Sequence, residues 1–160
     1  MIIPHIPGTD ADIAARRLTV TAWTLAANTA ARQARGLLRA QVTGHVTEQS
    51  VLDDLDLMVS ELATNAVVHT HGPYEMRILC HASVPVRCEI ADAGGGGLDE
   101  ITAHLRRKPD PISSVDALPL GGRGLRVVAH LSGGRCGAYA ARLCGTGQPG
   151  KSVWFAIPAR

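Results

Sequence analysis

The feature that most constrains the fold is a long segment, from about Ser50 to Thr70, in which apolar residues recur at steps of three and four. This spacing predicts a single long helix with one buried stripe, because an α-helix brings such residues onto one face. Ser50, answered by the carboxylate of Asp53 three residues later, is the predicted helix start. The stripe consists of Leu52, Leu55, Val59, Leu62, Ala66 and Val67.

A row of polar residues lies beside this stripe. Glu61, Asn65 and His69 follow one another at four-residue intervals, so their side chains point the same way from the helix. Taken alone, such a row is more often the solvated side of a helix than a site. Three glycine-bearing stretches downstream favour a site instead, and they are Asp92-Ala93-Gly94-Gly95-Gly96, Gly121-Gly122-Arg123-Gly124-Leu125 and Gly150-Lys151-Ser152-Val153-Trp154-Phe155.

The polar row and the three glycine stretches, in this order and at this spacing, resemble the Bergerat-type ATPase superfamily of histidine kinases, gyrase, heat-shock chaperones and mismatch-repair ATPases. Within it, they resemble the small bacterial anti-sigma factor serine/threonine kinases. The resemblance extends from Thr19 over nearly all of the remaining chain. It implies the histidine kinase-like ATPase fold, ATP and Mg²⁺ as cofactors, and two protein partners, a sigma factor and an anti-sigma factor antagonist protein. A homodimer is a further expectation, because homodimers are common among these relatives.

Length and composition set the outer limits of the interpretation. With 160 residues, of which 46% are hydrophobic and 3% aromatic, the chain is expected to form one domain with an aliphatic core. A net charge of +2 is too small to indicate a nucleic-acid-binding surface. The N-terminal residues lack a basic start followed by an apolar core, and no apolar run is long enough to span a bilayer. We therefore expect a soluble, cytoplasmic protein without nucleic-acid or membrane partners.

The four cysteines form two pairs of equal spacing, too widely separated within each pair for a zinc knuckle. We expect them to be buried free thiols in strands. A metal site that combines Cys80 with His69, His71 and His81 is a less favoured alternative. The cysteines are Cys80, Cys88, Cys136 and Cys144.

The order of the expected elements indicates the fold class. Residues 1–18 are predicted to be an N-terminal arm and residues 19–160 the ATP-binding domain. Strands are expected at about 19–25, 75–82, 85–91, 135–143 and 152–157, and helices at about 28–41, 50–70, 100–108 and 124–131. These elements predict an α+β two-layer sandwich, in which helices cover one face of a mixed, mostly antiparallel sheet.

The helix expected at 28–41 is predicted to begin with a cap at Asn28 and to have one basic side. That side is expected to face solvent, with a docking face for an acidic partner as the alternative. Its members are Arg32, Arg35 and Arg39.

The glycine stretches suit a nucleotide. Asp92, at a strand end, is the candidate acceptor for the exocyclic amine of adenine, a part that the aspartate plays in the family, and Gly94 and Gly96 follow it. The second stretch is expected to bring backbone amides to the phosphates at a helix N-terminus, because glycine permits close approach. Its candidate residues are Gly121, Gly122, Arg123, Gly124 and Leu125.

The remaining candidates carry the chemistry. Asn65 is the expected Mg²⁺ ligand, since Mg²⁺ takes oxygen ligands and needs few from the protein. Glu61, one turn earlier, is the expected general base, as the resemblance also implies. Lys151 and Ser152 are assigned to the cofactor site, with a solvated lysine as the alternative for Lys151. His69 is expected to pack under the site without chemistry.

The leading hypothesis is therefore an Mg-ATP-dependent protein serine/threonine kinase. It would act as an anti-sigma factor, phosphorylate a small antagonist protein and so regulate transcription. The alternative is a nucleotide-responsive binding module of the same fold that transfers no phosphate. A scaffold with a vestigial pocket is the third hypothesis.

Overall fold

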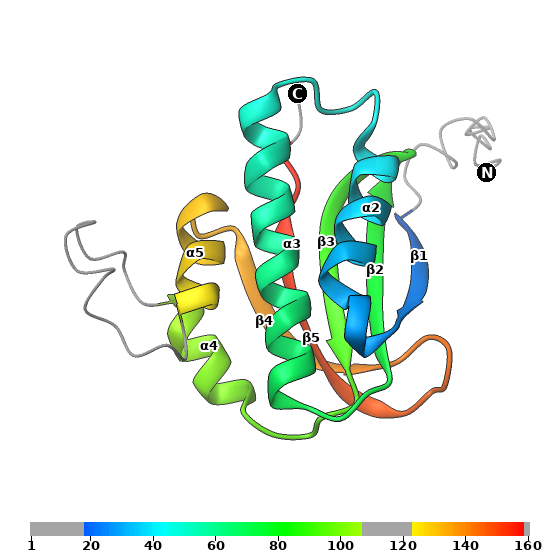
Figure 1. Cartoon of the computed structure of the whole chain (residues 1–160), viewed down its shortest axis with the longest axis vertical. Helices are drawn as coiled ribbons and strands as arrows, with labels where there is room; N and C mark the ends of the chain where they lie inside the picture. Colours follow the sequence, from blue (N-terminus) through cyan, green and yellow to red (C-terminus); the bar gives the residue numbers. More distant parts are fainter. Residues whose placement is uncertain (1–17, 107–122, 159–160) are drawn as a thin grey trace, which may run out of the picture.

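Five strands form one sheet in the order β1-β2-β3-β5-β4 (Figure 1). The computed structural model describes residues 18–106 and 123–158. Within them all four strand pairings are antiparallel, so the sheet is antiparallel throughout rather than mixed. The strands are β1 (Leu18–Leu25), β2 (Tyr74–His81), β3 (Val84–Asp92), β4 (Cys136–Arg142) and β5 (Pro149–Ala156).

The helices lie together on one face of this sheet (Figure 1). This arrangement confirms the predicted α+β layers, and the buried residues between the layers are mostly aliphatic, with Tyr74 and Phe155 as the buried aromatic residues of the described ranges. The helices are α2 (Ala30–Val42), α3 (Gln49–His69), α4 (Leu98–Arg106) and α5 (Arg123–Leu131), and a 3₁₀ turn, η1 (Ala27–Thr29), precedes α2. The largest fully buried core side chains include Leu38, Leu55, Met58, Met76, Ile78, Ile90 and Phe155.

Helix α3 has the buried stripe that its periodicity predicts, although Leu52 and Val67 are only partly buried. Leu55, Val59 and Leu62 are at most 2% exposed, because this face of α3 lies against the sheet and the neighbouring helices. The stripe continues to the end of the helix, where Ala66 is buried. Since α3 packs along its whole length, its polar side chains take fixed positions relative to the sheet.

The two predicted helix caps, Ser50 and Asn28, are wrong. Ser50 lies inside α3, which begins at Gln49 without a side-chain cap, and Asp53 accepts a hydrogen bond from Gln49 Nε2 at 2.7 Å. Asn28 lies in η1, so it does not cap α2. The Asp53 carboxylate also pairs with Arg39 of the adjacent helix at 3.4 Å. These side-chain contacts compete with the backbone hydrogen bond that a capping residue would make.

Two of the three arginines on the basic side of α2 bind α3 rather than facing only solvent. Arg35 Nη1 donates to Ser60 Oγ at 2.9 Å, and Arg39 Nε donates to Asp56 Oδ2 at 2.8 Å. Arg39 keeps 43% of its side chain exposed, so this contact lies at the surface, where solvent screens it and it adds little to stability. The basic side thus aligns α2 with α3, and docking of a partner there stays a prediction.

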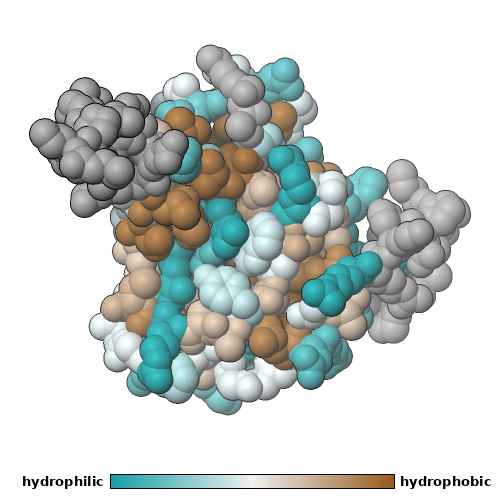
Figure 2. All heavy atoms as spheres, turned by 180° about the vertical axis from the view of Figure 1, so that it is seen from behind, coloured by the Kyte–Doolittle hydropathy of each residue, from teal (hydrophilic) through white to brown (hydrophobic). Residues whose placement is uncertain are grey.

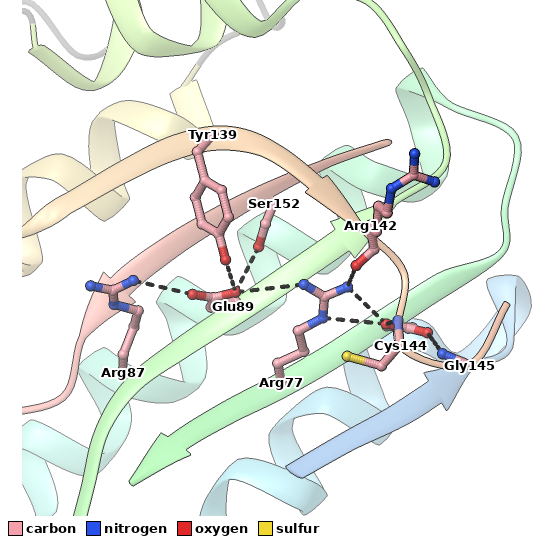
Figure 3. A network of polar contacts seen from close by, with 9 residues as sticks. Arg77, Arg87, Glu89, Tyr139, Arg142, Cys144, Gly145 and Ser152 are labelled. Carbon is pink, nitrogen blue, oxygen red and sulfur yellow. Dashed lines mark hydrogen bonds and ion pairs between the residues drawn. The ribbon is translucent and has the colours of Figure 1, made fainter. Parts of the chain in front are cut away.

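The sheet face opposite the helices carries charged residues that are nevertheless buried. Figure 2 shows this face, with hydrophilic and apolar residues interspersed. Glu75, Arg77 and Glu89 are at most 5% exposed there, because the hairpin tip (residues 143–148) between β4 and β5 folds back toward β2 (Figure 3). Each charge has a partner of opposite sign, with Arg77 Nη2 3.0 Å from Glu75 Oε2 and 4.0 Å between Arg77 Nη1 and Glu89 Oε2. Buried charges persist when they are paired in this way.

Glu75 holds the hairpin tip in place. Its two carboxylate oxygens accept hydrogen bonds from the backbone amides of Cys144 at 2.8 Å and Gly145 at 2.6 Å. Burial alone would raise the pKa of Glu75, but these amides and the Arg77 guanidinium outweigh burial, so the pKa lies below its ordinary value. The carboxylate therefore stays ionised at neutral pH and keeps the hairpin tip bound to β2.

Candidate functional site

A pocket of about 690 Å³ lies between α3, α4, the start of α5 and the ends of β3 and β5. Asn65 and His69 face it from α3, while Asp92 and Lys151 face it from the sheet. Aliphatic side chains make up much of the remaining wall, which suits a flat, partly apolar ligand. They are Leu62, Ala66, Ile90, Ile101, Leu125 and Val153.

Asp92 and Lys151 form a buried ion pair in the pocket. The antiparallel register places them opposite each other on β3 and β5, with Lys151 Nζ 2.8 Å from Asp92 Oδ1. Lys151 Nζ also donates to the carbonyl oxygen of Gly94 at 3.1 Å. Because Lys151 is only 6% exposed, the solvated-lysine alternative is wrong. Its charge is tolerated because it is paired and hydrogen-bonded.

Gly94 lets the chain turn closely around the Asp92 carboxylate. Its backbone amide donates to Asp92 Oδ1 at 2.8 Å. A Cβ at this position would lie 2.6 Å from Thr70 Cγ2 and 2.9 Å from Asp92 Oδ1, so no larger residue fits without a shift. Gly96 also lines the pocket, but a Cβ there would meet nothing within 4 Å. Of these two candidate residues, Gly94 is therefore the one that the local geometry requires to be glycine.

Glu61 and Asn65 meet the first turn of α5. A Cβ on Gly124 would lie 2.4 Å from Glu61 Oε2 and 3.1 Å from Asn65 Nδ2, so glycine allows this close approach of α3 and α5. Leu125, the next residue, lines the pocket. Asn65 is in the pocket wall, whereas Glu61 lies beside it against α5. A carboxylate at a helix N-terminus is favoured by the helix dipole.

The remaining predicted residues divide between two outcomes. Arg123 is the first residue of α5, while Gly121 and Gly122 lie outside the described residues. The assignment of Ser152 to the cofactor site is wrong, because Ser152 does not line the pocket. Its hydroxyl donates to Glu89 Oε2 at 3.0 Å on the opposite face of the sheet (Figure 3). Neighbouring strand residues point to opposite faces, so Lys151 and Ser152 cannot both face one pocket.

Further polar residues line the pocket although the sequence does not assign them to the cofactor site, among them Thr70, His71, Glu100 and His104. His71 follows α3, and Glu100 and His104 are one turn apart on α4, with 4.0 Å between His104 Nε2 and Glu100 Oε1. The spacing of Glu100 and His104 is the one signal that could have indicated a shared helix side. Both are polar groups at the rim, so they add hydrogen-bonding capacity to the pocket.

The cysteines do not form a metal site. No group of three or more His, Cys, Asp or Glu side chains in the described ranges could hold a metal ion, which removes the alternative of a Cys80 and histidine site. All four thiols are free, as expected, but only Cys88 is fully buried, and burial raises its pKa. Cys144 is exposed in the hairpin tip rather than in a strand, which corrects that expectation.

Replacing Gly124 by alanine should destabilise the protein, because the added methyl group would collide with Glu61 and Asn65. We expect a loss of about 1–3 kcal/mol in the free energy of unfolding, as for other overpacked positions. The matched control is Gly36→Ala in α2, where a Cβ meets nothing within 4 Å. That variant should gain about 0.5–1 kcal/mol, since alanine favours a helix over glycine. Urea unfolding of both variants is the measurement, and a gain in both would contradict the close α3–α5 contact.

Comparison with known families identifies the domain. No helix in residues 18–106 and 123–158 has the length and apolarity needed to cross a membrane. No curated protein matches the chain significantly. A family model described as the histidine kinase-like ATPase domain matches residues 13–133, about three quarters of the 160 residues. The matched segment contains α3, the first glycine stretch and Leu125, all of which contribute to the pocket wall. The chain therefore belongs to the histidine kinase-like ATPase family.

Proposed function

We propose that this protein binds Mg-ATP in the pocket and acts as a protein serine/threonine kinase of the anti-sigma factor type. It would bind a sigma factor and phosphorylate a small antagonist protein, and in this way regulate transcription. The observation that carries the proposal is the buried Asp92 carboxylate in an aliphatic pocket whose other side carries Asn65 next to Glu61 and the start of α5.

The residues present fit the adenine of ATP. In the described part of the chain both hydrogen bonds to the Asp92 carboxylate end on Oδ1, which leaves Oδ2 available to accept from an exocyclic amine. Ile90 and Val153 lie beside Asp92 in the pocket wall and supply apolar contact for a ring. A pocket of about 690 Å³ is within the range usual for cofactor sites.

The other end of the pocket fits phosphates and Mg²⁺. The first amides of α5 and the positive end of its dipole favour an anion near Gly124 and Leu125. Asn65 offers an oxygen ligand in the pocket wall, which is sufficient for an ion that retains most of its waters. When bound, Mg²⁺ would neutralise charge on the phosphate oxygens.

Glu61 is the residue that we assign to proton transfer. It lies one helical turn before Asn65 and next to the α5 N-terminus, so it is close to the end of the pocket that suits phosphates. Its carboxylate would accept the proton of the attacking serine or threonine hydroxyl. The start of α5 would keep that carboxylate in position through the close contact at Gly124.

One observation favours the second function, a nucleotide-responsive binding module. Glu61 packs against α5 beside the pocket and is not part of the pocket wall. A module that changes the α3–α5 contact on nucleotide binding would need this arrangement without any proton transfer. The two functions make the same prediction for ATP binding and differ only in phosphoryl transfer.

Mg-ATP should stabilise the protein against heat. A ligand that binds only the folded state adds about 2.7 kcal/mol at one hundred times its Kd. For a chain of this size the gain corresponds to a rise of about 5–10 °C in Tm. Differential scanning fluorimetry with and without millimolar Mg-ATP is the measurement, and an unchanged Tm would contradict nucleotide binding.

Two acid-to-amide variants locate the ATP-dependent gain. Asp92→Asn should lose most of the Tm rise, because an amide oxygen that keeps the hydrogen bonds from Gly94 and Lys151 leaves the NH₂ group, a donor, facing the exocyclic amine. Asp99→Asn should keep it, since Asp99 is an exposed residue of α4 outside the pocket wall. The rise is compared within each variant, so a change in the Tm of the free protein does not enter.

A further inference from the structure

We propose that Lys151 is a second base-reading residue, which donates a hydrogen bond to ring nitrogen N1 of adenine. This inference rests on the proposed binding of ATP in this pocket. It assigns Lys151 a contact of its own with the base, in addition to its support of Asp92.

The first argument is the number of donors on the Lys151 ammonium. A lysine ammonium has three N–H groups. Within residues 18–106 and 123–158, two acceptors lie in hydrogen-bond range of Nζ, Asp92 Oδ1 at 2.8 Å and the Gly94 carbonyl oxygen at 3.1 Å. Lys151 is 6% exposed and lines the pocket, so the pocket is where its third donor finds an acceptor. A charged donor without an acceptor at such a buried position would be costly.

The second argument is that Nζ is held in place before any ligand binds. The register of β3 and β5 sets Lys151 opposite Asp92, and the two hydrogen bonds fix the end of the side chain. A lysine usually loses considerable rotamer freedom when it binds a ligand. Here the side chain has already lost this freedom in the folded protein, so a hydrogen bond to the base would add directly to the affinity for ATP.

The third argument is complementarity to the base edge. Asp92 presents an acceptor and Lys151 presents a donor directly beside it, 2.8 Å apart. Adenine presents the reverse pair on one edge, an amine donor next to the N1 acceptor. Guanine in the same orientation would set its O6 acceptor against the Asp92 carboxylate and its N1–H donor against Lys151. The pair therefore selects adenine both by attraction and by repulsion of guanine.

The test compares ATP with 1-deaza-ATP, in which N1 is replaced by C–H and the exocyclic amine is kept. We expect the wild-type protein to bind 1-deaza-ATP about 10- to 100-fold more weakly than ATP, the usual worth of a hydrogen bond to a charged group. Lys151→Met should bind ATP more weakly and should bind the two nucleotides within about threefold of each other, since methionine has no donor. Isothermal titration calorimetry with Mg²⁺ gives all four Kd values.

Each outcome decides between the possible roles of Lys151. If Lys151 merely supports Asp92, Lys151→Met lowers the affinity for both nucleotides alike and the wild-type protein does not distinguish them, which overturns the inference. A wild-type preference for ATP that persists in Lys151→Met overturns it too. If Lys151→Met fails to fold, Lys151→Ala, which also lacks a side-chain donor, replaces it in the same comparison. Failure of the wild-type protein to bind ATP removes the proposed function itself, whereas equal binding of ATP and 1-deaza-ATP removes only the reading of N1.

Discussion

Glu61→Gln should bind ATP like the wild-type protein and transfer phosphate to the antagonist protein about 10²- to 10⁴-fold more slowly. Glutamine keeps the size of the side chain, so the contact with Gly124 on α5 can persist. An amide cannot accept the proton of the attacking hydroxyl, and this step alone is removed. The measurement is transfer of label from γ-labelled ATP to the antagonist, run beside a nucleotide titration.

Two further variants make this result specific to Glu61. Glu48→Gln carries the same chemical change at an exposed residue that precedes α3 and should transfer phosphate at the wild-type rate. Asn65→Ala should lower binding as well as transfer, because it removes the proposed Mg²⁺ ligand from the pocket wall. Equal transfer by wild-type protein and Glu61→Gln would show that Glu61 is not the base. No transfer by the wild-type protein to any antagonist would favour the binding module.

The fold could be predicted from the sequence where the signal is local and periodic. The stripe through Leu55, Val59 and Leu62 repeats at helical spacing and is buried as expected, because burial of one helix face determines that spacing. Helix starts could not be predicted in the same way. Asp53 has the right spacing from Ser50 for a capping box, but its carboxylate binds Gln49 and Arg39 instead.

The candidate site could be predicted from the sequence where one residue, by its place in a strand or helix, indicates that it lies in the site. Asp92 ends a strand and Asn65 lies on the polar row of a helix, and both line the pocket. The pairing of Lys151 with Asp92 depends on the register of β3 and β5, which are far apart in sequence, so no local pattern reveals it. Ser152 was assigned to the site by its place in a motif, although the alternation of strand side chains excludes it once Lys151 faces the pocket.

The glycines show the same limit. The sequence attributes Gly124 to close approach by phosphates and assigns no such part to Gly150, whereas at both positions an added Cβ would meet protein atoms. Gly124 faces the Glu61 carboxylate, and Gly150 faces the backbone of Asp92. Glycine can be required because distant segments pack closely or because a ligand approaches the backbone. The sequence alone does not distinguish these two reasons.

Gly150→Ala should therefore disrupt both stability and nucleotide binding. A Cβ on Gly150 would lie 1.9 Å from the Asp92 carbonyl oxygen and 2.9 Å from Ala93 Cα. Both atoms belong to the backbone at the end of β3, so relief requires that β3 and β5 separate where Asp92 pairs with Lys151. Overpacking a core position usually lowers the free energy of unfolding by about 1–3 kcal/mol. We expect at least this loss here, because backbone atoms cannot rotate away as a side chain can.

The loss of ATP binding in Gly150→Ala follows from the same displacement. Separation of the strand ends would lengthen the contact between Lys151 Nζ and Asp92 Oδ1, now 2.8 Å, and would misplace the carboxylate that we assign to the adenine amine. Gly95→Ala is the matched control, since Gly95 is exposed and a Cβ there meets nothing within 4 Å. Urea unfolding and calorimetric titration with Mg-ATP should leave Gly95→Ala close to wild type. If Gly150→Ala equals Gly95→Ala in both measurements, the β3–β5 junction does not hold the base-reading pair in the way that its geometry indicates.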